Sequence, residues 1–278
     1  MKYLAFLICL FSFSSVADCQ PNRESCVPVS QWQFSLAIGG GVHTNPLNGG
    51  DNIPLVIVPS LSYYGESVFF DNGVLGYAII ENEHVAISAI TQFNQEKAYF
   101  TRWHPKNIFV TSAISNTFYG ATKEAIDIDQ VDKRDWALDA GAQLNWFIAE
   151  HTDVVAKLLW DVTGVYQGYN AYISVNHQIK LPLNSFASFG LGAQVNSADL
   201  VNYYYGIKQR DAFFTQVTFK GKTSINPIFR VKLTKVLSEQ WRLSFYWKRK
   251  LLDANTANSP LINTKQVDTV FLGMEYEF

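Results

Sequence analysis

Large apolar and polar residues alternate over the last stretch of the chain, DTVFLGMEYEF. Alternation with period two places every second side chain on one face of an extended strand. One face carries Val270, Leu272, Met274, Tyr276 and Phe278. A strand of this kind that closes a barrel has no free edge. We therefore predict that these residues form a terminal assembly signal, which the barrel assembly machinery of an outer membrane would receive.

The same alternation recurs in WQFSLAIGG, DWALDAGAQLNW and WRLSFYWKRK, and aromatic residues stand at the ends of their apolar faces. Strands of soluble sandwiches are usually about 5–6 residues long, whereas membrane-spanning strands need about 9–11, with apolar side chains toward lipid. The long segments here therefore favour an all-β transmembrane barrel over a sandwich. Their polar faces carry charged residues that suit a wet lumen, namely Lys157, Asp161, Arg230, Lys232, Arg242, Lys248 and Glu275.

Alternation and turn residues together predict about twelve strands in an antiparallel up-and-down barrel. The approximate ranges are 32–43, 53–63, 66–71, 74–81, 84–95, 135–148, 153–166, 168–181, 185–196, 225–236, 239–250 and 264–278. With the C-terminus in the periplasm, the short turns at 64–65, 82–83, 149–152, 182–184 and 237–238 become periplasmic, and the long loops 44–52, 96–134, 197–224 and 251–263 become extracellular. Asn72 and Gly73 predict a type I′ hairpin turn, although the strand before them is too short to cross the membrane.

The first residues, MKYLAFLICLFSFSSVA, predict a signal peptide over residues 1–17 and hence export to a Gram-negative outer membrane. Residues 18–31 would then form a periplasmic N-terminal arm, and residues 32–278 the barrel. Asp18 stands where a lipoprotein would have a small residue before its cysteine. In an oxidising compartment Cys19 and Cys26 can close a small disulfide loop or remain two free thiols. Neither state implies catalysis.

Composition changes this picture little. The chain has 278 residues, of which 48% are hydrophobic and 17% charged, which suits a barrel or a soluble enzyme. The formal net charge of -2 provides no basic surface, so nucleic acid is not an expected partner. Beyond the leader no run of about 20 apolar residues predicts a membrane-spanning helix. Outer-membrane lipids are therefore expected to surround strands.

The sequence contains neither a G-x-S-x-G elbow nor an H-E-x-x-H pair. His104 precedes an acidic group, Asp127, Asp129, Asp132 and Asp135, that would suit a metal or acid-base site at the outer rim. A solvated acidic loop explains the same pattern more simply. We therefore predict no enzyme activity, no catalytic or metal-binding residue and no cofactor.

One loop segment is a candidate contact site. Tyr203, Tyr204, Tyr205, Lys208 and Arg210 would cap the lumen or line a small-ligand pocket, although tyrosines at this level also form interface girdles. About twelve strands enclose a lumen that side chains can partly fill. The pattern thus leaves open a plugged barrel and a conducting pore.

Several segments in order along the chain resemble the MipA/OmpV family of Gram-negative outer-membrane proteins. They are WQFSLAIGGGVHTNP, IPLVIVPSLSYYGESVFF, NYYYGI, DANTANSPLI and LGMEYEF. The first loop, HTNPLNGGDNIP, lacks the tyrosine expected there, and the 96–134 insertion also departs from the family. The resemblance implies a scaffold that brings a membrane-bound lytic transglycosylase together with a bifunctional penicillin-binding murein synthase, with no catalytic residues of its own. A small-solute pore and a surface adhesin are the alternatives.

Overall fold

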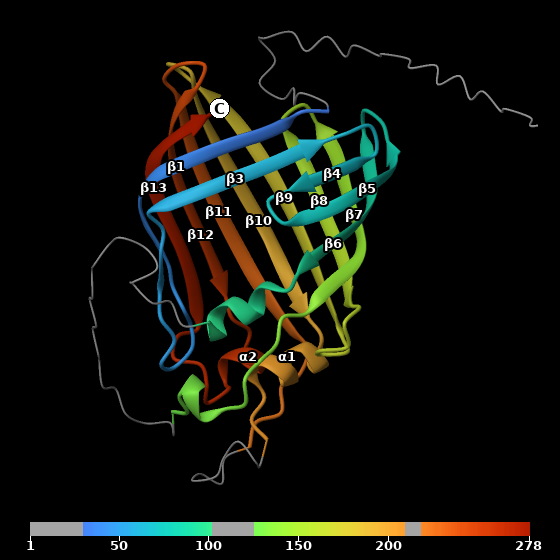
Figure 1. Cartoon of the computed structure of the whole chain (residues 1–278), viewed down its shortest axis with the longest axis vertical. Coiled ribbons are helices and arrows are strands. Elements are labelled where there is room, and N and C mark those ends of the chain that lie inside the picture. The colour runs from blue at the N-terminus through green and yellow to red at the C-terminus, as the bar shows by residue number, and fades with distance from the viewer. Residues whose placement is uncertain (1–29, 102–124, 209–217) are drawn as a thin grey trace, which may run out of the picture.

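The computed structural model describes residues 30–101, 125–208 and 218–278. One antiparallel sheet closes on itself as a barrel, because the last strand pairs with the first (Figure 1). The strands are β1 (Trp32–His43), β2 (Ile53–Pro54), β3 (Ile57–Tyr64), β4 (Val68–Asp71), β5 (Val74–Glu81), β6 (Val85–Phe93), β7 (Leu138–Ala149), β8 (Thr152–Asp161), β9 (Tyr169–Leu181), β10 (Ser185–Asn196), β11 (Ser224–Val236), β12 (Trp241–Leu251) and β13 (Gln266–Glu277). Within the described ranges, no helix has the length and apolar character that a bilayer crossing requires.

The predicted number of twelve strands is confirmed, because β2 and β3 are two parts of one strand beside β1. Leu55 N–H donates to the Gly41 carbonyl at 3.0 Å, and the Val56 carbonyl accepts from Gly39 N–H at 2.9 Å. Between the pairs Ile38–Ile57 and Val42–Pro54, β1 has the three residues 39–41 opposite only Leu55 and Val56, and this extra residue in β1 is a β-bulge. The strand predicted over 53–63 is therefore broken at this bulge.

Short turns connect the strands at the end of the barrel where the C-terminus lies (Figure 1), as predicted. Outer-membrane barrels keep their short turns in the periplasm and their long loops outside. This end is therefore periplasmic, and α1 (Ala198–Tyr205) and α2 (Ala254–Ala257) lie at the extracellular end. Asn72 and Gly73 have φ of 47° and 91°, as the predicted type I′ turn requires.

The outer surface of the wall is apolar. Aromatic side chains are exposed near both ends of the strands: Trp32, Trp146, Trp241 and Phe278 toward the periplasm, and Phe93, Trp136, Trp160 and Tyr169 toward the outside. These two levels match the aromatic girdles of membrane barrels. The alternating residues point inward. They include every charged residue that the sequence placed in the lumen, such as Lys157 beside exposed Leu158 and Arg230 beside exposed Phe229.

Several predicted bounds are wrong at the extracellular end. The strand predicted over 153–166 ends at Asp161, because that carboxylate accepts backbone N–H groups from the following loop, including those of Gly164 at 3.0 Å and Tyr166 at 2.7 Å. The strand predicted from residue 135 begins at Leu138. The segment 197–224, predicted as a loop, contains α1, whose first turn is capped by the Ser197 hydroxyl accepting from Leu200 N–H at 3.3 Å.

Candidate functional site

The extracellular loops fold together over the mouth of the barrel. We call this layer the plug, and it comprises the described residues 44–52, 94–101, 125–137, 162–168, 197–208, 218–223 and 252–265. It has a hydrophobic core of its own, which also includes Val267 of β13. The core residues are Leu47, Tyr99, Ile126, Ile128, Ala137, Tyr166, Leu200, Val201, Tyr204, Tyr205, Ile207, Leu252, Ala257, Leu261 and Val267. A barrel usually places its apolar side chains toward lipid, so a separate core at one mouth indicates a built closure.

Backbone and amide groups join the loops of the plug to each other. Asn48 Nδ2 donates to the Pro260 carbonyl at 2.7 Å, and Ile126 N–H reaches the same carbonyl at 3.1 Å. Ser259 Oγ donates to the Tyr205 carbonyl at 2.7 Å. Four segments that are distant in sequence are therefore held as one layer.

A buried ion pair fastens the plug to the barrel wall. Glu96 belongs to the 3-10 helix η1 (Gln95–Phe100), and its Oε1 lies 3.1 Å from Lys250 Nζ on β12. Gln194 Nε2 on β10 donates to the same oxygen at 3.3 Å, while the Tyr205 hydroxyl on α1 donates to Oε2. Glu96 and Lys250 are 3% and 7% exposed. One carboxylate thus connects η1, α1, β10 and β12.

The protonation states in this network follow from burial and charge. Burial alone would raise the pKa of Glu96, but the Lys250 ammonium and the hydrogen bond from Tyr205 hold that pKa below its ordinary value. Burial and the adjacent Glu96 carboxylate raise the pKa of Tyr205 well above its usual range. Near neutral pH, Tyr205 is therefore a donor and Glu96 a charged acceptor.

A second buried carboxylate fastens the plug at the end of β7. Asp139 at the extracellular end of β7 is completely buried. It accepts from the Tyr166 hydroxyl at 2.6 Å and from the side-chain amides of Asn94 and Asn170 at 2.7 Å each. Burial, followed by the Asp139 carboxylate, raises the pKa of Tyr166 above its ordinary range, so this hydroxyl also remains a donor.

A buried arginine joins α1 to the segment before β7. Arg134 is 7% exposed, and its guanidinium donates to the carbonyls of Tyr204 at 3.5 Å and Gly206 at 3.2 Å. These carbonyls stand at the end of α1, where a cation is favourable. The guanidinium also lies 5.8 Å from the centre of the Tyr203 ring.

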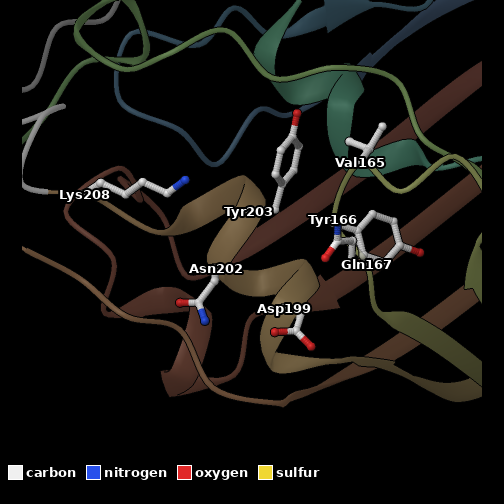
Figure 2. A pocket seen from close by; sticks show the side chains of 7 residues that line it. All are labelled: Val165, Tyr166, Gln167, Asp199, Asn202, Tyr203 and Lys208. Atoms are coloured by element: carbon white, nitrogen blue, oxygen red, sulfur yellow. The ribbon is translucent and has the colours of Figure 1, made fainter.

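A shallow pocket of about 210 Å³ opens on the extracellular surface of the plug. Figure 2 shows Asp199, Asn202 and Tyr203 on α1, with Lys208 beyond the helix end and the remaining lining residues on the loop after β8. The Tyr203 hydroxyl accepts from Asp135 N–H at 2.9 Å. The pocket offers one carboxylate, one ammonium and two side-chain amides, which suits contact with a polar surface better than catalysis.

The structure brings most of the predicted contact residues together and divides their roles. Tyr203 and Lys208 line the surface pocket. Tyr204 and Tyr205 are buried in the plug core and cap the lumen, and none of the three tyrosines forms a lipid-facing girdle. Arg210, His104 and both cysteines, Cys19 and Cys26, lie outside the described residues, as does the predicted signal peptide. Among the described residues, no group of three or more His, Cys, Asp or Glu side chains could hold a metal.

The predicted terminal signal occupies the closing strand. Leu272 is 54% exposed on the outer face, and alternation places Val270, Met274, Tyr276 and Phe278 on that same face. Sequence reasoning missed Glu96, Asp139 and Arg134. Alternation places Asp139 on the polar face of its strand but gives no role to any of the three, because their partners come from distant loops and strands. Glu96 and Lys250, for example, are 154 residues apart.

Comparisons with known proteins agree with this architecture. A family model described as MltA-interacting protein MipA matches residues 36–278. The outer membrane proteins Omp26La of Vibrio anguillarum and OmpV of Vibrio cholerae are each 22% identical over 154 residues, which is 55% of this chain and 59% of each relative. The match thus spans less than two thirds of those relatives. The outer membrane protein YiaT of Escherichia coli O157:H7 is 21% identical over 248 residues, or 88% of this chain and 91% of the relative.

A solved outer membrane channel from Pseudomonas putida F1 is similar in structure. It has 13% sequence identity and a TM-score of 0.42, and the match covers 93% of this chain and 99% of that chain.

Proposed function

The chain belongs to the MltA-interacting protein (MipA) family of outer-membrane barrels, and from this premise we propose that it is a scaffold for murein enzymes. It would hold a lytic transglycosylase at the periplasmic face of the outer membrane and bring a murein synthase to it. The family match carries this proposal. The plugged mouth is consistent with it, because a scaffold needs no open passage to the outside.

The contact must be made from the periplasm, where the chain offers short turns and the sequence-predicted arm over residues 18–31. By the sequence prediction, this arm would be the longest periplasmic segment. A Cys19–Cys26 loop would pre-organise it and so lower the ordering cost that flexible segments meet on binding.

Two neighbouring turns provide an apolar surface on the same rim. Leu183 is 81% exposed and has a φ of 61°, a region that disfavours a branched side chain. Leu237 in the adjacent turn is 50% exposed, and Val236 N–H binds the Asn184 carbonyl at 2.9 Å, which keeps the turns together. The backbone of Leu183 is thus strained, while its exposed side chain gains little packing within the described chain. This combination suggests that Leu183 serves a contact outside the chain. Together the arm and these turns form the proposed docking rim.

Capture of purified lytic transglycosylase by the folded protein in lipid vesicles tests the proposal. Deletion of residues 18–29 should abolish capture, and Leu183→Asn should weaken it while leaving the barrel at least as stable, since asparagine tolerates positive φ. Val162→Asn is the matched control, because Val162 is 59% exposed in an extracellular loop. Undiminished capture by both rim variants would refute the docking rim. No capture by the wild type would refute the scaffold.

A small-solute channel is the second candidate, since the lumen below the plug is lined by polar and charged residues. The plug would then have to open. We expect no current through the wild-type protein in planar bilayers at neutral pH. Stepwise solute-dependent currents, together with absent capture, would assign the protein to the channel class.

A further inference from the structure

A cavity of about 170 Å³ lies directly beneath the plug, inside the barrel. Its walls include Glu96 of η1, Lys248 and Lys250 of β12, Thr269 of β13 and His43 of β1. The volume is several times the ~30 Å³ that one water occupies and below the ~300–1,000 Å³ of pockets for drug-sized ligands. The space therefore fits a small ion rather than a sugar or peptide.

The cavity wall carries more positive than negative charge. Glu96 is bound by Lys250, so this pair is neutral as a unit. Lys248, two residues earlier on β12, also points inward and lines the cavity, yet no carboxylate of the described residues lies within ion-pair distance of it. This arrangement leaves one ammonium uncompensated at the cavity surface.

The neighbouring strand adds a second cation at the same level. Arg230 on β11 stands directly opposite Lys248 in the strand register. Among the described residues, its guanidinium donates to the neutral groups Asn176 Oδ1 at 2.7 Å and Ser174 Oγ at 3.3 Å. Like charges opposite each other on one face of a sheet are destabilising. An anion held by Lys248 would relieve this repulsion.

Neutral hydrogen-bonding groups continue the same row across the barrel. Lys248 pairs with Thr269 on β13, which pairs with His43 on β1. His43 Nδ1 lies 2.7 Å from Thr269 Oγ1. When the hydroxyl donates to Nδ1, the imidazole proton is on Nε2 and provides a further donor.

Among the described residues, inward side chains are buried near the plug and exposed near the periplasm. On β9 the inward residues Asn170 and Ser174, near the plug, are buried, whereas Gln178 is exposed. On β11 the inward residue Asn226 is buried, whereas Lys232 is exposed. This gradient of exposure indicates that the described part of the lumen below the cavity faces the periplasm.

We propose that this cavity is a periplasm-facing binding site for a small phosphate- or carboxylate-bearing anion, with Lys248 as its principal ligand. Thr269 and His43 provide hydrogen bonds, and Arg230 contributes to the positive potential. The site is independent of the murein scaffold function.

Calorimetric titration of the purified full-length protein with inorganic phosphate, and separately with acetate, tests the site at constant ionic strength. Lys248→Gln should weaken binding about tenfold or more, the effect of losing one charge-assisted hydrogen bond. Lys248→Arg should retain most of it. Lys232→Gln is the matched control, because Lys232 is an exposed lumenal lysine nearer the periplasm, and it should change affinity less than about twofold, as expected for screened charges.

Urea unfolding provides a second readout. Phosphate or acetate should raise the unfolding midpoint of the wild type but not of Lys248→Gln, which without anion should be no less stable than the wild type. Saturable binding of either anion that depends on Lys248 supports the proposal and identifies the preferred chemistry. Absent saturable binding by the wild type, or equal affinity in Lys248→Gln, would overturn it.

Discussion

Replacing Glu96 by glutamine is expected to destabilise the closed plug by about 3–5 kcal/mol, the cost of breaking a buried ion pair. The magnitude follows from burial, since the two partners are 3% and 7% exposed and their charged atoms lie 3.1 Å apart. A surface pair would contribute only about 0–1 kcal/mol. Glutamine keeps the shape of the side chain but leaves the Lys250 ammonium buried without a counter-ion and removes the charged acceptor of the Tyr205 hydroxyl.

Limited proteolysis of the folded protein in lipid vesicles measures plug opening. When the plug opens and closes faster than it is cut, cleavage tracks the open population. The loss of 3–5 kcal/mol then predicts cleavage within the plug that is roughly 150- to 5,000-fold faster. Glu239→Gln makes the same chemical change in an exposed periplasmic turn and should have no effect.

The double variant Glu96→Gln with Lys250→Met separates the ion pair from other contacts. Methionine removes the unpaired charge, so cleavage should return toward the wild-type rate, with a coupling energy of up to about 3 kcal/mol. The assigned role of the pair would be refuted if Glu96→Gln were cleaved at the wild-type rate, or if the double variant were cleaved as fast as Glu96→Gln alone.

Three further outcomes are expected. Leu191→Arg, on the lipid face of β10 and 59% exposed, should cost about 2–4 kcal/mol in urea unfolding in vesicles, whereas Gln178→Arg in the lumen should be mild; equal costs would contradict the strand facing. Tyr166→Phe should lower plug stability by about 1–3 kcal/mol by removing a donor to Asp139, measured as faster plug proteolysis, and an unchanged rate would exclude that role. The pKa of Glu96 in the folded protein lies below its ordinary 4.5. The stability that Glu96 gives to the plug is therefore fully present above pH 4.5 and is lost as the pH falls through the folded-state pKa. Plug protection against protease that does not depend on Glu96 at neutral pH would contradict this.

The barrel could be predicted from the sequence because each wall strand repeats one rule, apolar outward and polar inward, and each periplasmic turn is short. Asn72 and Gly73 even specified their turn type. The plug could not be predicted in the same way, since its contacts join residues such as Glu96 and Lys250 across 154 positions. One local signal for α1 does exist in the sequence. Ser197 as N-cap with Asp199 in the first turn is a helix start, and it places Tyr203, Tyr204 and Tyr205 on α1.

The short β4 strand leaves a lateral seam in the barrel wall. β4 pairs only with residues 62–64 of β3, so among the described strands none lies against residues 57–60 on that side. The N–H and the carbonyl of Leu61 both point to that side. The carbonyl accepts from Asn72 N–H at 3.0 Å, and the N–H donates to Asn72 Oδ1 at 3.1 Å. Alternation gives the backbone groups of Pro59 and Ile57 the same direction. Proline has no N–H, so Ile57 is the sole donor along the seam. A strand from a second barrel would find little to pair with there, and the seam therefore resists edge-to-edge association between copies in the crowded membrane.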